Sequence, residues 1–113
     1  MKNNRKGYRV ERNIRLLFER YGWGVVRSGG SLGLYDLIAF KNRKALFIQV
    51  KSTKNRILYY YGYIGKRMYG FPFVLVVDFG RGKRIITSPK RKVRIEDGKD
   101  LLEFLKSSRN GFQ

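Results

Sequence analysis

The chain has 113 residues, 26 basic against 8 acidic side chains, a net charge of +18, and no cysteine or histidine. This composition excludes disulfides, thiolate or imidazole metal ligands, and a histidine general base. An enzyme built from it must use carboxylates, amides, hydroxyls and lysines, and the hard oxygen donors among these suit Mg²⁺ or Mn²⁺. Because 42% of the residues are hydrophobic, we expect one folded domain over residues 1–113.

The charge indicates a polyanionic partner. We expect nucleic acid, because the release of counterions from phosphates drives basic proteins onto it. An anionic membrane surface is the alternative. No apolar stretch approaches the ~18 residues of a membrane span and no signal peptide is visible, so we expect a cytoplasmic protein without a membrane partner.

An amphipathic helix is predicted over residues 6–21, because apolar residues recur there at steps of three and four. These residues are Val10, Ile14, Leu17, Phe18 and Tyr21. Gly22 and Gly24 end this helix. A strand is predicted at 23–28, a loop at 28–33, and two strands at 35–40 and 45–52 around the turn KNRK.

The second half of the chain has a less regular pattern. Residues 53–70 can begin as a strand and finish as a helix, although Gly62 and Gly65 disfavour a helix. Strands are predicted at 71–79 and 84–88, followed by a closing helix at 97–106 with Asp97 as its cap. This order of elements predicts an α/β domain with a central mixed sheet flanked by helices.

Three polar residues stand inside the two central apolar runs: Asp36, Gln49 and Lys51. If Phe40 faces Ala45 across the turn, Asp36 faces Gln49 with their Cβ atoms roughly 4.5–5.5 Å apart. Lys51 then lies on the same face as Gln49. A carboxylate and an amide oxygen at this spacing can bind one hard cation beside the lysine. The alternative is that Asp36 caps a turn or pairs with Lys51.

A second carboxylate, Glu11, lies roughly 75° from the centre of the helix's apolar stripe. If the helix packs over the hairpin, Glu11 can approach the same cation. The alternative is a surface ion pair with Arg15, four residues further along the helix. A metal-bound water at such a site can attack a phosphate, and a lysine can stabilise the charge that develops.

Four blocks of sequence carry a resemblance: KGYRVERN at 6–13, VVRSGGS at 25–31, YDLIAF at 35–40 and FIQVKS at 47–52. Together they resemble the archaeal Holliday junction resolvases, including those of archaeal viruses, in the PD-(D/E)xK nuclease superfamily. The resemblance implies a restriction-endonuclease-like core and a Mg²⁺-dependent endonuclease, for which Mn²⁺ can substitute, acting in DNA recombination and repair. It also implies a homodimer that binds four-way DNA junctions and cuts two opposing strands symmetrically.

The resemblance implies roles for individual residues. The expected catalytic residues are Glu11, Asp36, Gln49, Lys51 and Ser31, with Ser28 as the competing loop serine. The expected metal ligands are Glu11, Asp36, Gln49 and Val50. Arg12 and Arg27 match arginines needed for binding or cleavage, and nearby basic clusters add Arg5, Lys6, Lys54 and Arg56 as DNA-binding residues. Gln49 stands where the family usually has Glu, which makes Glu11 more important for holding the cation.

An aromatic cluster is a further feature of the second half. Its members are Tyr59, Tyr60, Tyr61, Tyr63, Tyr69 and Phe71. They predict a subunit interface or, for at least half of them, part of the core.

Two other functions stay open at the level of sequence. The same chemistry can act on duplex or mismatched DNA, or the chain can be a non-catalytic basic DNA-binding protein. The second of these has no use for an acid at Asp36.

Overall fold

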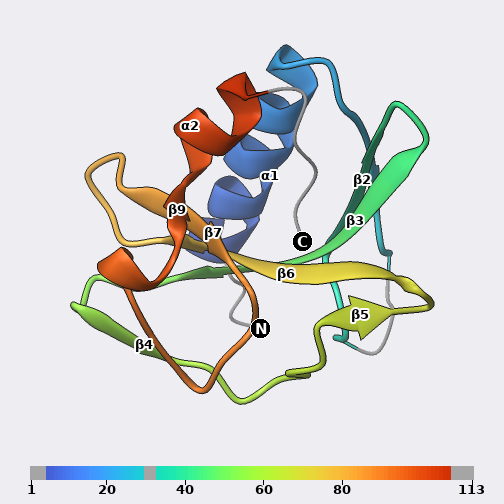
Figure 1. The fold of residues 1–113 in the computed structure, drawn as a ribbon. Coiled ribbons are helices and arrows are strands. Elements are labelled where there is room, and N and C mark those ends of the chain that lie inside the picture. Colours follow the sequence, from blue (N-terminus) through green and yellow to red (C-terminus); the bar gives the residue numbers. More distant parts are fainter. Residues whose placement is uncertain (1–4, 30–32, 108–113) are drawn as a thin grey trace.

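The computed structural model describes residues 5–29 and 33–107, and Figure 1 shows a twisted sheet with both helices on one of its faces. The elements in chain order are α1 (Arg5–Arg20), β1 (Gly24–Arg27), β2 (Leu37–Lys41), β3 (Lys44–Ser52), β4 (Ile57–Tyr59), β5 (Arg67–Met68), β6 (Phe71–Asp78), β7 (Arg84–Thr87), β8 (Lys92–Arg94), a 3₁₀ turn (Ile95–Asp97), β9 (Lys99–Asp100) and α2 (Leu101–Lys106). The predicted α/β class is confirmed.

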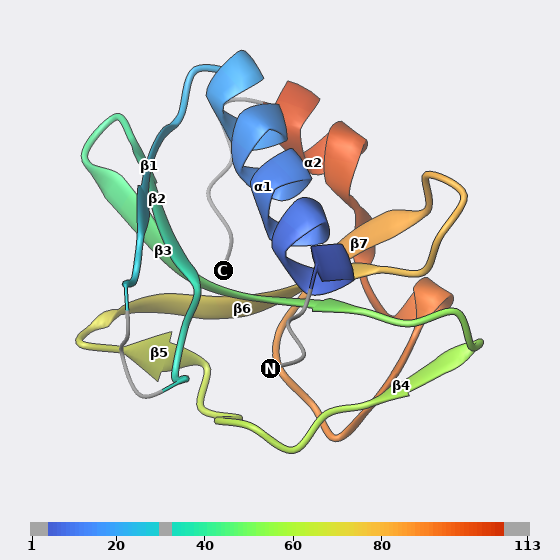
Figure 2. The same ribbon diagram turned by 180° about the vertical axis from the view of Figure 1, so that it is seen from behind.

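The main sheet has the strand order β1-β2-β3-β6-β7-β9, and β5 pairs with β6. The pairing of β3 with β6 is parallel, whereas β1–β2, β2–β3, β5–β6, β6–β7 and β7–β9 are antiparallel. The predicted mixed sheet is therefore confirmed. Strands β4 and β8 pair separately, and Figure 2 shows β4 on the side of the sheet opposite the helices.

Helix α1 ends at the predicted glycine. Gly22 has a φ of +91°, and its N–H donates to the Glu19 carbonyl at 3.0 Å. The Trp23 N–H donates to the Phe18 carbonyl at 3.1 Å, which completes a Schellman motif. The rings of Phe18 and Trp23 also meet edge to face, with centroids 5.5 Å apart. This terminus turns the chain sharply into β1.

The main core lies between the helices and the sheet. From α1 it takes the predicted apolar positions Val10, Ile14 and Phe18, and from α2 it takes Leu101, Phe104 and Leu105. The sheet contributes Leu37, Ala39, Leu46, Ile48, Val74, Val76 and Ile86. On the opposite face, Tyr60 and Val93 from the β4–β8 layer cover Leu75, Val77 and Ile85. Because α1 packs against β3, its position relative to the central strands is set by the core.

The predicted start and cap of the closing helix are wrong. The closing helix begins at Leu101, and its cap is Asp100, whose carboxylate accepts the Glu103 N–H at 3.1 Å. Asp97 instead accepts the Arg94 N–H at 2.7 Å and belongs to the preceding 3₁₀ turn. The possible helix within residues 53–70 does not form, and this segment carries β4 and β5.

The prediction that at least half of the aromatic cluster is buried is also wrong. Tyr60 is 2% exposed, but the other five members are between 40% and 80% exposed. Among the described residues, no helix has the length and apolar character needed to cross a membrane.

The packing of α1 gives a stability prediction. Ile14 is 0% exposed, so Ile14→Ala should lower the free energy of unfolding by about 2–5 kcal/mol through lost burial and a residual cavity. Leu16 lies on the same helix but is 41% exposed, so Leu16→Ala should cost about 1 kcal/mol or less. Chemical denaturation measures both variants. Equal losses would show that α1 does not pack through the Ile14 face.

Candidate active site

The register of the β2–β3 hairpin brings the predicted polar residues together. Leu37 faces Ile48 and Phe40 faces Ala45, around a two-residue turn at 42–43. This is the register expected from the sequence, and Asp36 directly precedes its last pair, Leu37 and Ile48. The Gln49 Nε2 donates to Asp36 Oδ2 at 2.9 Å. The expectation that the two side chains meet is therefore confirmed.

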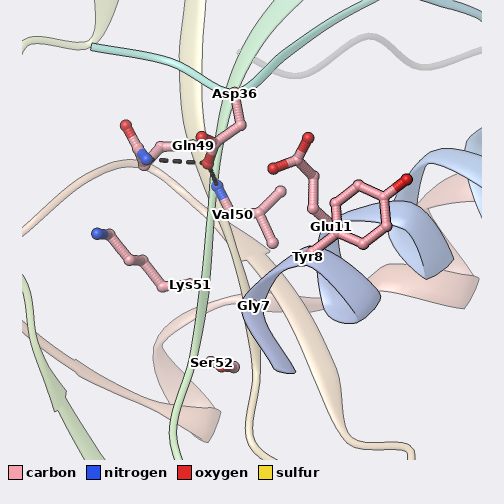
Figure 3. A pocket seen from close by; sticks show the side chains of 8 residues that line it. All are labelled: Gly7, Tyr8, Glu11, Asp36, Gln49, Val50, Lys51 and Ser52. Carbon is pink, nitrogen blue, oxygen red and sulfur yellow. Dashed lines mark hydrogen bonds between the residues drawn. The ribbon is translucent and has the colours of Figure 1, made fainter. Parts of the chain in front are cut away.

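Asp36 stands where the pairing of β2 with β3 stops. Its own N–H donates to the Ile48 carbonyl at 2.8 Å, although Ile48 is already the register partner of Leu37. The next donor on β3, the Val50 N–H, meets the Asp36 carboxylate at 2.8 Å (Figure 3). The Asp36 carboxylate thus takes the place of the carbonyl acceptor that a neighbouring strand would supply. An unpaired backbone donor would be costly to leave without a partner. The rest of β3, from Val50 to Ser52, is open on this edge.

Burial raises the pKa of Asp36 above its ordinary value of 3.8. Desolvation, the largest cause, penalises the charged carboxylate. The Val50 N–H, the positive charge of Lys51 and the Gln49 amide act in the opposite direction but do not cancel the effect of burial. Asp36 is consequently a carboxylate whose negative charge is incompletely compensated by the protein.

Glu11 approaches the same place from α1. Figure 3 shows its side chain directed from the helix toward Asp36. One Glu11 carboxylate oxygen, Oε2, accepts the Arg27 Nε–H at 3.2 Å, and the Arg27 guanidinium lies 5.4 Å from the centre of the Tyr8 ring. The alternative partner considered from the sequence, Arg15, pairs instead with Glu19 at 3.4 Å.

These side chains line one open cavity of about 420 Å³. Its walls are Gly7, Tyr8, Glu11, Asp36, Gln49, Val50, Lys51 and Ser52. The four predicted side chains that carry the proposed chemistry, Glu11, Asp36, Gln49 and Lys51, thus share a single space. Lys51 is exposed, whereas Gln49 is 7% exposed.

The remaining predicted site residues are not among the walls of this cavity or lie outside the described residues. Arg12 is exposed on α1, and Lys54 and Arg56 are exposed just beyond β3. The Ser28 N–H donates to the Asp36 carbonyl at 2.9 Å, so this loop serine is held next to the site. Its competitor Ser31 lies outside the described residues, as do the side chains of Arg5 and Lys6.

Three residues of the wall were not predicted from the sequence: Gly7, Tyr8 and Ser52. Tyr8 precedes Glu11 by three residues, which places both on one side of a helix. Ser52 follows Lys51 on β3. Helical spacing from Glu11 was the available signal for Tyr8. Ser52 and Gly7 carry no comparable signal in the sequence.

The donors of this cavity fit a hard divalent cation. No group of three or more His, Cys, Asp or Glu side chains gathers within residues 5–29 and 33–107. Two carboxylates and one amide do face the cavity, and Mg²⁺ typically takes one or two carboxylates and completes its shell with other oxygens and water. The Gln49 amide presents its nitrogen to Asp36, with its oxygen on the far side (Figure 3), so binding through that oxygen requires rotation of the terminal amide.

The mixed sheet and its helices place the chain in the restriction-endonuclease-like fold class. It is similar to the solved structure of Archaeoglobus fulgidus Hjc, a Holliday junction resolvase from an archaeal hyperthermophile, with a TM-score of 0.71 and 20% identity. That similarity covers 96% of this chain and 99% of the other. The family model "Archaeal holliday junction resolvase (hjc)" matches residues 2–63, more than half of the sequence. The chain therefore belongs to the archaeal Holliday junction resolvase family.

A curated relative agrees with this assignment. The chain is 38% identical over 55 residues to the crossover junction endodeoxyribonuclease Hjc of Methanocaldococcus jannaschii. The matched stretch is 49% of this chain and 41% of that relative. The family match, over residues 2–63, includes every residue of the candidate site.

The pKa of Asp36 predicts an unusual effect on stability. A carboxyl group whose pKa is raised on folding favours the folded state only at low pH. This contribution is complete below the ordinary pKa of 3.8 and is lost as the pH rises through the higher folded-state pKa. Asp36→Asn keeps an acceptor for the Val50 N–H without the charge. In buffer with a chelator it should therefore melt at a higher temperature than the parent protein at neutral pH, and the difference should shrink in acid.

Asp78→Asn is the matched control. Asp78 accepts the Gly80 N–H at 2.7 Å and pairs with Arg84 at 3.3 Å, so its replacement should lower the melting temperature. Thermal melts followed by circular dichroism compare the two variants. A loss of stability in Asp36→Asn at neutral pH would mean that the Asp36 charge is fully compensated in the folded protein.

Proposed function

We propose that this protein is a structure-selective endonuclease that resolves four-way DNA junctions by Mg²⁺-dependent hydrolysis. The observation that carries the proposal is the meeting of Glu11, Asp36, Gln49 and Lys51 at one open cavity. Membership of the archaeal Holliday junction resolvase family supports the choice of substrate. A basic architectural protein has no comparable use for a half-buried acid opposite an amide and a lysine.

Glu11, Asp36, Gln49 and Val50 are the proposed holders of the cation, the last through its backbone. Nucleases of this family are metal-dependent. The bound cation would supply an activated water and stabilise charge on the phosphate. Mg²⁺ is the proposed ion, with Mn²⁺ as a substitute, because both prefer oxygen donors.

The residues of the cavity have distinct proposed tasks in the reaction. Asp36, held by the Val50 N–H and the Gln49 amide, keeps a fixed carboxylate at the metal. Lys51, exposed on the same edge, stabilises the negative charge that grows on the phosphate oxygens. Glu11 is proposed to leave Arg27 for the metal, which frees the arginine for a DNA phosphate. The catalytic serine that the family resemblance places on a loop near the site is proposed to be Ser28 or Ser31.

Binding of the junction is proposed to rest mainly on phosphate contacts. Arg27 pairs with the cavity residue Glu11, Arg12 follows Glu11 on α1, and Lys54 and Arg56 are exposed just beyond β3. Lys6 and Arg5 are proposed as further DNA-binding residues from the sequence alone. Such contacts orient the DNA without reading its bases. A homodimer is proposed because symmetric cutting of two strands needs two sites, and sedimentation velocity tests it.

Cleavage of a labelled synthetic four-way junction in Mg²⁺ tests the proposed roles of the cavity residues. Asp36→Asn and Lys51→Ala should each slow cutting by about a hundred-fold or more. The first removes a charged ligand of the proposed metal ion, and the second removes the cation that stabilises charge on the phosphate. Both variants should keep junction binding, measured by gel shift in a chelator. Glu19→Gln, on α1 but away from the cavity, is the matched control and should cut normally.

A linear duplex of the same sequence completes this experiment. Selective cutting of the junction supports the proposal, whereas equal cutting of both substrates indicates a duplex nuclease. Normal turnover by Asp36→Asn rules out this active site. If the parent protein binds but never cuts with any divalent ion, the protein is a non-catalytic binder.

Binding of the cation in the absence of DNA tests the proposed metal ligands. Mn²⁺ binding, followed by electron paramagnetic resonance, should weaken by about ten-fold or more in Glu11→Gln and in Asp36→Asn, because each loses a charged oxygen donor. Glu19→Gln should bind Mn²⁺ as the parent does. Gln49→Glu adds a carboxylate at the position where the family usually has one and should tighten binding. If Glu11→Gln bound Mn²⁺ with unchanged affinity, α1 would contribute no ligand to the metal site.

A further inference from the structure

Tyr8 is a wall of the candidate active site that the proposed reaction does not use. It lies one helical turn before Glu11 on α1, and its side chain is 54% exposed. Figure 3 shows the Tyr8 hydroxyl directed away from Asp36 and Lys51. The part of Tyr8 that can act at this site is therefore the face of its ring.

Arg27 meets this ring from the sheet. It is the last residue of β1 and is paired with Leu37, which is buried in the core between the sheet and the helices. Because opposed residues of neighbouring strands direct their side chains to the same face, Arg27 points toward α1. Its guanidinium carbon lies 5.4 Å from the centre of the Tyr8 ring. This is within the ~6 Å over which a cation is attracted to an aromatic face.

The same guanidinium has a second partner on α1. The Arg27 Nε–H donates to Glu11 Oε2 at 3.2 Å, so one arginine contacts two residues that lie three positions apart on the helix. A divalent cation competes with the arginine for the carboxylate, because it binds oxygen donors. The ring face offers no such donor and stays available to the arginine. When Glu11 turns to the proposed metal ion, Arg27 therefore loses one of these two partners and keeps the other.

An arginine that lost both partners would move freely in water. The Arg27 side chain is 53% exposed even in the ion pair, and the strand that carries it ends at this residue. A long side chain loses rotamer freedom when it is fixed on a ligand, and this loss weakens the contact that it makes. A ring that already holds the guanidinium at the cavity reduces the loss before the DNA binds.

We propose that Tyr8 is the positioning residue for Arg27. Its ring holds the guanidinium at the cavity while Glu11 binds the metal ion, and this keeps the arginine in position for a phosphate of the DNA. The inference rests on the proposed function, since it concerns the arginine that Glu11 is proposed to release. It adds that an aromatic face, which touches neither the metal ion nor the reacting atoms, determines where that arginine lies.

Junction binding in a chelator tests this inference without metal or cleavage. Glu11→Ala removes the ion pair and keeps the ring. In that background, Tyr8→Leu should weaken binding of a labelled four-way junction by about two- to five-fold, the range expected for an exposed cation–π contact. Tyr8→Phe keeps the ring and should bind as Glu11→Ala alone does. Tyr8→Leu should have no further effect once Arg27→Met is also present, because it acts through the arginine. Fluorescence anisotropy measures the whole series.

Cleavage in Mg²⁺ provides a second measurement, with Glu11 intact. Tyr8→Leu should slow single-turnover cutting by about two- to five-fold, whereas Tyr8→Phe should cut as the parent does. Tyr59→Leu is the matched control. Tyr59 is also 54% exposed and has a cation, the Lys92 ammonium, 5.9 Å from its ring centre, but it lies on β4 and does not line the cavity. This control should bind and cut as the parent does.

Four results would overturn the role of Tyr8. Equal junction binding by Glu11→Ala with and without Tyr8→Leu would mean that the ring does not hold the arginine. An equal loss in Tyr8→Phe would assign the effect to the hydroxyl. A loss that persists beside Arg27→Met would mean that the ring contacts the DNA directly. A large fall in the melting temperature of Tyr8→Leu would indicate a structural role, which is not expected of an exposed side chain.

Failure of the proposed hydrolysis is recognised separately. If the parent protein binds the junction but never cuts it, the endonuclease proposal fails. The binding series in chelator involves no cutting, so it still decides whether Tyr8 positions Arg27.

Discussion

The Asp36 carboxylate accepts the Val50 N–H at the point where β2 stops pairing with β3. This contact lets β3 run on for three residues without a neighbour on that edge, and those residues form a wall of the candidate site. Without an acceptor at Asp36, either the edge would need another strand or the Val50 N–H would be left unpaired. The same hydrogen bond that ends the pairing therefore opens the cavity and fixes its principal acid.

This arrangement destabilises the folded state, because the charged carboxylate of Asp36 is half-buried. Four of the chain's eight acidic side chains, Glu11, Glu19, Asp78 and Asp97, form ion pairs with a lysine or arginine. Asp36 differs from them, because the groups that bind its carboxylate are a neutral amide and a backbone N–H. Lys51 compensates that charge only in part, and the proposed divalent cation at the carboxylate would offset the cost of desolvation. Functional sites commonly depart from the most stable local arrangement in this way.

The sequence predicted the geometry of the site better than the boundaries of the elements around it. Strand periodicity and a short turn determine register, so counting residues predicted that the side chains of Asp36 and Gln49 meet. The path of residues 53–70 did not follow, because its pairings are set by distant partners: β4 joins β8, and β5 joins β6. Asp97 and Asp100 are both reasonable caps by residue type. The choice between them depends on how β9 pairs with β7, which local pattern does not contain.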